Sequence, residues 1–344
     1  MIKVIKFGLK AFPPFFKINT YSSVFVLVDE NSRKHCLPLL VPYLPGHQII
    51  QIKSGEKHKT LTSCEFIWAS LLKKQADRNS LLINLGGGVI TDIGAFCASV
   101  FMRGVDFVNV PTSLLAMTDA AVGGKTGVDF LNFKNMIGTF SEPKLLCIDP
   151  EFLKTLPQKQ MLSASAEIFK HALLQNKKEV KKHLENPFVQ ATEAEILRQI
   201  KNSNRFKWSV VSKDSMDKNI RQQLNLGHTI AHALESYFIA FKKPLLHGEA
   251  VALGLVGEAF IAHCFYNLSY ECFLNIVYWY DLNFKKPELK ELNFNTLLKW
   301  MQKDKKNINS ELQLVLLEKE GSVTMNNVVS HSQLKLALKF LVDF

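Results

Sequence analysis

The chain has 344 residues, of which 47% are apolar, 10% aromatic and 21% charged. A chain of this length and composition can bury a large core, is long enough for two domains, and is not a candidate for extensive disorder. The net charge of +11 fits either a solvated surface or attraction of an acidic ligand. No basic stripe with interleaved aromatic residues is present, so nucleic-acid binding is not favoured.

Targeting signals are weak. Lysines, a glycine and two prolines interrupt the first 20 residues, so no secretion signal is expected there. The longest apolar stretches, near 81–101 and 250–266, are broken by Asp92 and Glu258, whereas a membrane helix needs roughly 18 uninterrupted apolar residues. The six cysteines lie far apart without a C-x-x-C pair, which favours reduced core residues. We therefore expect a cytoplasmic protein that does not bind a membrane.

Residues 1–150 alternate short β-rich runs with helical patterns. Buried strands are expected at 24–29, 48–52, 81–85, 107–110 and 145–148. Apolar strands separated by amphipathic helices are typical of a parallel α/β sheet. The sequence predicts a Rossmann-like α/β domain over 1–150.

From residue 151 the strand signals nearly vanish. Apolar stretches with a 3.6-residue period occur at 164–175, 191–213, 227–241, 247–267, 269–281 and 294–303, and a short β-like segment lies at 313–317. Such periodicity is typical of packed helices. We predict a mainly α-helical second domain over 151–344.

A glycine turn follows the predicted strand at 81–85. The segment Leu85–Asp92 contains three consecutive glycines and opens an apolar helix. Glycines in this position let backbone N–H groups approach a pyrophosphate at a helix N-terminus. Asp29 ends an earlier strand, where a carboxylate can hold ribose hydroxyls or simply cap a helix. The pattern favours a dinucleotide site.

A polar cluster lies between residues 111 and 138. Asp119, Lys125, Lys134 and Asn135 stand there among glycines, alanines and serines. Small residues allow a ligand to approach the backbone, and lysines donate to phosphate or carboxylate groups. A glycine-rich surface loop is the plain alternative, but four such residues so close together favour a binding site.

A set of metal ligands is spread over three predicted helices. His228 and His232 are spaced one helical turn apart, His247 opens the next helix, and Glu167 stands on an otherwise apolar helix. Three nitrogen or oxygen ligands with an open position are typical of a catalytic divalent metal such as zinc. The spacing leaves open which three of the four bind.

Together these segments resemble the 3-dehydroquinate synthase family. The resemblance covers about residues 24–317 and rests on the segments 54–59, 86–92, 103–104, 111–119, 123–127, 134–138, 166–170, 224–235, 246–254 and 301–306. The departures are few, among them Ser165 before Ala166 and Ser113 in place of a threonine. None removes a ligand or a charged contact.

The resemblance implies NAD and a Zn2+ or Co2+ ion as cofactors. Its metal ligands fall on Glu167, His228 and His247, and His232 then becomes a contact to the substrate phosphate. The NAD contacts fall on Asp29, Asn31, Glu56, Lys59, Gly87, Gly88, Val89, Asp92, Thr112, Ser113, Lys125, Lys134, Thr155 and Leu156.

The family's substrate contacts also fall on matching residues of this chain. They are Asp119, Lys125, Asn135, Lys170, Lys207, Arg221, Asn225, His232 and one of Lys305 and Lys306, with Lys305 preferred. Arg103 matches an arginine that the family lends across the interface of a homodimer. The expected partner is a phosphorylated seven-carbon sugar acid.

The implied enzyme is a lyase of the shikimate pathway, which supplies aromatic amino acids. It converts 3-deoxy-D-arabino-heptulosonate 7-phosphate to 3-dehydroquinate and phosphate by transient NAD oxidation, β-elimination, re-reduction and intramolecular aldol closure. A sibling sugar-phosphate cyclase is one alternative, against which Asn135, Arg221 and Asn225 argue because they suit a carboxylate. A metal-dependent polyol dehydrogenase is another, and it would form NADH stoichiometrically. A non-enzymatic binding module would leave the carboxylate and histidines without a purpose.

Overall fold

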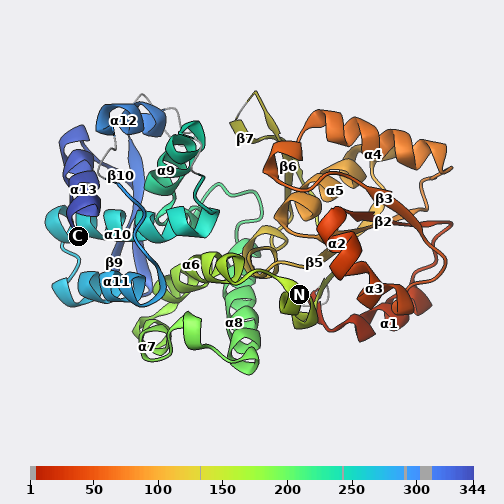
Figure 1. Ribbon diagram of the computed structural model, residues 1–344, viewed down its shortest axis with the longest axis horizontal. Helices are drawn as coiled ribbons and strands as arrows, with labels where there is room; N and C mark the ends of the chain where they lie inside the picture. The colour runs from red at the N-terminus through yellow and green to blue at the C-terminus, as the bar shows by residue number, and fades with distance from the viewer. Residues whose placement is uncertain (1–4, 132, 242–243, 290–292, 303–311) are drawn as a thin grey trace. The chain divides into compact units, whose positions relative to one another are not determined.

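The computed structural model describes residues 5–131, 133–241, 244–289, 293–302 and 312–344 (Figure 1). Contacts within the chain divide it into two units, Met1–Pro157 and Gln158–Phe344. The first unit carries a six-stranded sheet, and the second is built mainly of helices around one apolar cluster. The predicted fold class, a parallel α/β sheet followed by a mainly helical region, is confirmed.

The sheet of the first unit is parallel throughout, with strand order β1-β8-β5-β4-β2-β3. Its strands are β1 (Ile5–Phe7), β2 (Val24–Val28), β3 (Gln48–Gln51), β4 (Leu81–Gly86), β5 (Asp106–Pro111) and β8 (Leu145–Ile148). Every residue of β2, β4 and β8 is buried, as expected for strands covered on both faces. The five predicted strands are confirmed, whereas β1 was not predicted.

Helices connect these strands. They are α1 (Phe12–Ile18), α2 (Glu30–His35), α3 (Leu37–Leu40), α4 (Leu61–Lys73) and α5 (Gly88–Val100). The core between sheet and helices includes Phe25, Leu27, Ile67 and Ile93, all 0% exposed. Gly94 of α5 is required because a Cβ there would lie 1.9 Å from the side-chain oxygen of Asn84 in β4. The helix therefore packs directly onto the strand before it.

The strand order contains one reversal of direction. From β2 the chain moves outward to β3, and it then crosses to the other side of β2 and continues through β4, β5 and β8. In open parallel sheets the crevice at such a reversal, outside the carboxyl ends of the strands, is where ligands bind. Here the crevice lies between the ends of β2 and β4, which are paired neighbours.

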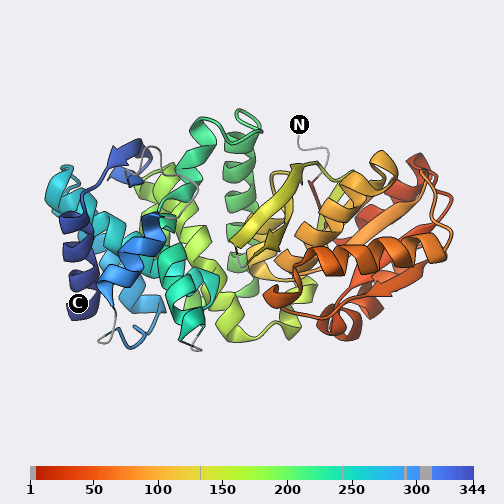
Figure 2. The ribbon, with the colours of Figure 1, turned by 90° about the horizontal axis from the view of Figure 1, so that it is seen from above.

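A two-stranded antiparallel hairpin, β6 (Lys125–Phe130) and β7 (Phe133–Phe140), also belongs to the first unit. It lies against α5 and is drawn in yellow in Figure 2. Gly127 and Gly138 pair across it, and a Cβ on Gly138 would lie 2.1 Å from the carbonyl oxygen of Thr126. These two glycines thus serve strand pairing.

The second unit contains eight α-helices and a β-hairpin among its described residues. They are α6 (Gln158–Gln175), α7 (Lys177–Glu185), α8 (Glu193–Val211), α9 (His228–Ala240), α10 (His247–Phe265), α11 (Tyr270–Asn283), α12 (Phe294–Gln302) and α13 (His331–Asp343), with β9 (Gln313–Lys319) and β10 (Ser322–Val328). All six predicted helical stretches and the strand near 313–317 are confirmed. The elements α7, α13 and β10 were not predicted.

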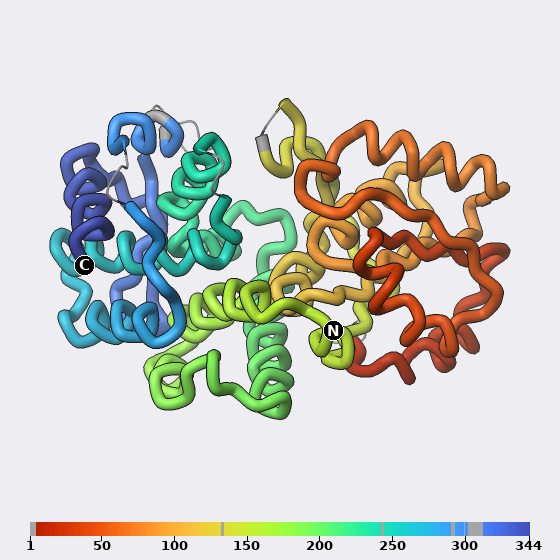
Figure 3. The backbone as a smooth tube through the Cα atoms, in the orientation of Figure 1, coloured from red at the N-terminus to blue at the C-terminus, as the bar shows by residue number. Residues whose placement is uncertain are grey.

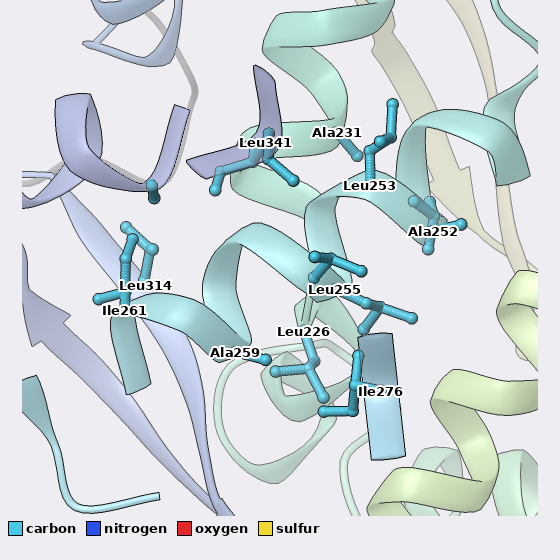
Figure 4. Close-up of a cluster of buried hydrophobic side chains, with 14 of the residues drawn as sticks. Leu226, Ala231, Ala252, Leu253, Leu255, Ala259, Ile261, Ile276, Leu314 and Leu341 are labelled. Atoms are coloured by element: carbon cyan, nitrogen blue, oxygen red, sulfur yellow. The ribbon is translucent and has the colours of Figure 1, made fainter. Parts of the chain in front are cut away.

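Helix α10 forms the centre of this unit. It contacts α6, α9, α11, α13 and β9, and the tube in Figure 3 shows these segments gathered around it. In the apolar cluster around it, Leu255 lies near Ile276, and Ile261 of the same helix lies beside Leu314 (Figure 4). At Gly257 a Cβ would lie 2.8 Å from Ile230 of α9 and 3.1 Å from Leu341 of α13. The helix is therefore tightly enclosed by its neighbours.

By length and composition α10 is also apolar enough to cross a membrane, but 72% of its most apolar window is buried inside the structure. Core helices of soluble proteins commonly have these properties. The burial of α10 is therefore explained by the packing of the second unit itself.

Candidate active site

Three side chains from three helices of the second unit meet at one point. Glu167 lies on α6, His228 opens α9 and His247 opens α10. Their ligand atoms all lie within 4.8 Å of one another. The Nε2 atoms of His228 and His247 lie 3.3 and 3.4 Å from the same oxygen, Glu167 Oε1. We call this group the triad.

The second nitrogen of each histidine has its own partner. His228 Nδ1 lies 3.1 Å from the carbonyl oxygen of Leu226, to which it can donate its proton. His247 Nδ1 lies 3.3 Å from Glu235 Oε2 on α9. A proton held on Nδ1 in this way leaves Nε2 as the ligand atom, which is the usual arrangement around a metal. Glu235 was not predicted as a site residue, because its partner His247 lies on a different helix.

The charges of the triad depend on burial and on the charged neighbours of each group. Burial alone would raise the pKa of Glu167, but the Lys170 ammonium and the two histidines hold this pKa well below its usual range. Burial and Lys170 lower the pKa of His228 to about 3. Burial opposes protonation of His247 too, but Glu167 and Glu235 raise its pKa to about 10. An ionised Glu167 and a neutral His228 are the forms that bind a metal, and a metal ion at His247 would displace the proton from its Nε2.

A divalent metal fits this arrangement. Glu167 is 0% exposed, and within the described residues its carboxylate faces the Lys170 ammonium and the two histidines, so burial of this charge is favourable only when cations stand close to it. Two ligands on a tetrahedral zinc ion, each about 2.0–2.1 Å from it, stand about 3.3–3.4 Å apart. The two nitrogen–oxygen distances of the triad match that spacing.

The helices of the triad approach each other very closely. A Cβ on Gly248 would lie 1.7 Å from the carbonyl oxygen of Ser163 on α6. The N–H of Gly248 donates to Ser163 Oγ at 3.0 Å. The start of α10, and with it His247, is thereby fixed against the helix that carries Glu167. Ser163, which was not predicted as a site residue, thus helps to position His247.

The predicted substrate-binding residues of the second unit differ in their contacts and in their burial. Lys170 Nζ donates to the carbonyl oxygen of Leu224 at 2.7 Å, which ties α6 to the turn Ile220–Asn225 that contains Arg221 and Asn225. Lys207 on α8 is buried, as is Arg221. The rings of His232 and His228 lie 5.4 Å apart. Within the described residues His232 is not part of the triad's cluster of ligand atoms.

The predicted NAD residues of the first unit lie along the carboxyl edge of the sheet. Asp29 follows β2, Gly87 and Gly88 follow β4, and Thr112 and Ser113 follow β5. Further predicted contacts lie in α2, beyond β3, at the start of α5 and after β8, namely Asn31, Glu56, Val89, Thr155 and Leu156. The crevice at the strand reversal is therefore bordered by residues that the sequence predicted.

The N-terminus of α5 is free of side-chain caps. Its N-cap is Gly87, where a Cβ would lie 3.4 Å from Ser113 Oγ, and no side chain caps the helix there. Uncapped N–H groups at a helix start attract an anion. Asp29, in contrast, accepts from Ser32 N at 2.7 Å and caps α2. The helix-cap interpretation of Asp29 thus holds, and a ribose contact would have to use the remaining part of its carboxylate.

The side chain of Lys59, a predicted NAD contact, bridges two other predicted residues of the first unit. Its Nζ lies 2.6 Å from Asp92 Oδ2 and 2.6 Å from the side-chain oxygen of Asn135. Burial would lower the pKa of Lys59, but Asp92 and Glu56 raise it, so the side chain is a buried cation. It connects the start of α5 to the β6–β7 hairpin.

Arg103 lies beyond the end of α5 in a strained turn. Met102, Arg103 and Gly104 have φ values of 50°, 70° and 114°. Left-handed backbone at two successive non-glycine residues is costly, and such strain concentrates at functional sites. Arg103, Lys125, Lys134 and Asn135 are exposed, Asp119 is half-buried, and Lys305 and Lys306 lie outside the described residues.

Comparisons with known proteins place the chain. Residues 49–163 match the family model for the N-terminal part of 3-dehydroquinate synthase, and residues 164–307 match that for the C-terminal part. The 3-dehydroquinate synthase of Parabacteroides distasonis is 35% identical over 322 residues, covering 93% of this chain and 91% of that protein.

Solved structures show the same fold. A 2-deoxy-scyllo-inosose synthase complexed with carbaglucose-6-phosphate, NAD+ and Co2+ aligns with a TM-score of 0.89 at 21% identity, covering 98% of this chain and 96% of that one. The 2-epi-5-epi-valiolone synthase of Streptomyces hygroscopicus with NAD+ and Zn2+ bound aligns with a TM-score of 0.84 at 24% identity, covering 99% and 96%. Because both family models match in order and a relative is similar over nearly its whole length, the chain belongs to the 3-dehydroquinate synthase family.

Proposed function

We propose that this enzyme converts 3-deoxy-D-arabino-heptulosonate 7-phosphate to 3-dehydroquinate and phosphate, using NAD and one divalent metal ion that it retains. The observation that carries the proposal is the triad, in which two histidine Nε2 atoms face one buried carboxylate oxygen at the spacing of metal ligands. Family membership supplies the reaction.

Glu167, His228 and His247 would hold the metal, and the N-terminus of α5 with Gly87, Gly88 and Asp29 would hold the dinucleotide. When bound, the ion supplies a Lewis acid that lowers the pKa of a substrate hydroxyl, and NAD supplies a hydride acceptor and donor. Glu235 and the carbonyl of Leu226 keep both histidines in the tautomer that a metal needs.

The cationic side chains would bind and orient an anionic substrate. Lys170 and Lys207 are held in buried positions, and Arg221 is fixed by its Nη1, which donates to the carbonyl of Ser215 at 2.8 Å. Cations that are already ordered and desolvated hold a phosphate and a carboxylate more strongly than mobile surface lysines do. This is the role that we assign to Lys170, Lys207 and Arg221, and we propose that Asn225 and His232 add hydrogen bonds to the same substrate.

Asp119, Lys125, Asn135 and Lys134 of the first unit complete the proposed contacts to substrate and cofactor, and Lys305 stays a prediction. We also propose that the protein is a cytoplasmic homodimer in which Arg103 serves the site of the neighbouring subunit. The strained turn around Arg103 supports this assignment.

The proposal is tested by following two products of one reaction. With the heptulosonate phosphate and a trace of NAD, the enzyme should release phosphate and form dehydroquinate while NADH absorbance stays flat. Stoichiometric NADH would instead indicate a polyol dehydrogenase. Turnover of a different seven-carbon phosphate, with none of this one, would indicate a sibling cyclase.

A further inference from the structure

The carboxylate of Glu258 is buried at 1% exposure in the middle of α10, and the proposed chemistry does not use it. Its oxygens accept hydrogen bonds from the start of a different helix. Gly227 N donates to Oε2 at 2.6 Å, and Thr229 N donates to Oε1 at 3.1 Å. Ile230 N lies 3.4 Å from the same Oε1. A single side chain thus satisfies the N-terminus of α9.

Helix α9 cannot cap itself. Its N-cap is Gly227, with φ of 82° and no side chain. A Cβ at this position would lie 2.9 Å from Leu255 of α10, so the close packing of the two helices also requires glycine. The first N–H groups of a helix need acceptors, and a negative charge there is favoured by the helix dipole. Glu258 provides both from outside the helix.

The residues bound by Glu258 flank a triad histidine. Gly227 and Thr229 stand on either side of His228 in the chain, so their hydrogen bonds fix the backbone from which the His228 ring projects. Glu258 itself belongs to α10, the helix that begins with His247. One carboxylate therefore joins the backbone of one histidine to the helix of the other.

We propose that Glu258 is a positioning residue of the metal centre, which holds His228 at its distance from His247 and Glu167 by capping α9 from within α10. This inference rests on the proposed function, because it requires that the triad binds a metal. Glu258 touches neither the metal nor the substrate, and it acts through the backbone of α9.

The test compares Co2+ binding by Glu258→Gln and Glu258→Ala with that of the unchanged protein. Affinity is measured by competition with a chromophoric chelator, and ligand geometry by the visible absorption of bound Co2+. The glutamine keeps one acceptor but turns an amide N–H2 toward the remaining backbone donors, so its affinity should fall by at least about tenfold, the lower end of the loss typical of altered outer-shell partners. The Co2+ affinity of the alanine variant should fall further, and the visible spectrum of bound Co2+ should shift in both variants.

Ser330→Ala is the matched control. Ser330 Oγ caps α13, accepting from Gln333 N at 3.2 Å, and α13 packs on α10. This variant should lower the thermal unfolding midpoint while Co2+ affinity and spectrum stay unchanged. A folded Glu258→Gln protein with the original affinity and spectrum overturns the inference alone, as does a control that loses Co2+ equally. Absence of Co2+ binding in the unchanged protein overturns the proposed function, and this inference with it.

Discussion

The metal triad and the glycine turn after β4 are built in opposite ways. The triad is made of side chains from positions far apart in the chain, with Glu167 buried and the two histidines half-buried. The glycine turn is made of consecutive residues whose backbone N–H groups are the functional part, and no side chain caps it. A site made of side chains depends on neighbours that fix each rotamer, whereas a site made of backbone depends on the absence of side chains.

The largest expected effect is the loss of bound metal when a residue of the triad is replaced. We expect Glu167→Ala, His228→Ala and His247→Ala each to reduce bound metal to near zero, because two remaining ligands leave a divalent ion poorly held. His232→Ala should keep its metal and lose activity, since His232 is assigned to the substrate phosphate. Metal content after dialysis, measured beside turnover, checks both. A metal-free His232 variant would show that the ligands were assigned wrongly.

The second-largest effect on metal binding should come from Glu235, the partner of His247 Nδ1. Glu235→Gln removes the charge that lies 3.3 Å from His247 Nδ1, and we expect metal affinity to fall by about ten- to a hundredfold. NAD affinity, which we assign to the first unit, should not change. Titrating both ligands into the same preparation tests this, and a loss of NAD binding alone would contradict the assignment.

The third prediction concerns Arg103, which we assign to the site of the neighbouring subunit. If Arg103 were only an exposed cation at a helix end, it would stabilise the fold by about 0.3–1 kcal/mol. Arg103→Ala would then have nearly unchanged activity. A contact to the substrate phosphate of a neighbouring subunit is worth about 1.5–3 kcal/mol, and its loss should cost roughly ten- to a hundredfold in substrate affinity.

The same assignment predicts complementation. Sedimentation should show a dimer, and mixing Arg103→Ala with Lys125→Ala protein should restore part of the activity, since each mixed dimer rebuilds one intact site. Full activity in a monomer, or no recovery after proven subunit exchange, would exclude the shared site.

The smallest effect concerns stability. In Gly248→Ala the new Cβ would lie 1.7 Å from backbone oxygen, whereas in Gly87→Ala it would meet Ser113 Oγ at an ordinary 3.4 Å. We expect the first change to destabilise folding by about 1–3 kcal/mol, the usual cost of overpacking, and the second to leave stability nearly unchanged while weakening NAD binding. Urea unfolding and NAD titration of the two variants check this. Equal stabilities would show that α6 and α10 can separate at little cost.

The fold was largely predictable because its strands and long helices are continuous apolar runs. Val24–Val28 and Leu81–Gly86 are buried along their whole length, and such runs carry a strong signal. The β6–β7 hairpin was missed because glycines and lysines hide its alternation, and Gly127 and Gly138 reveal their purpose only once they face each other. The domain limits at 150 and 151 stay a prediction.

The site was predictable in its residue types but not in its geometry. The spacing of His228 and His232 by one turn made them equal candidates, and only the helix crossings bring His247 rather than His232 to Glu167 Oε1. Glu235 ends the matched segment 224–235 and Glu258 interrupts an apolar stretch, but their roles could not be predicted because each acts on a residue of a different helix. The roles of individual substrate residues remain predictions.

The enclosure of Gly257 between Ile230 and Leu341 has a consequence for the time at which the site matures during synthesis. His247 leaves the ribosome long before Leu341, at about 5–20 residues per second. Until α13 has emerged, α10 lacks one wall of its packing and the apolar surface of Leu334, Leu338 and Leu341 that covers it. The nascent chain therefore presents its ligands for several seconds before they are held in register, so metal acquisition should follow translation rather than accompany it.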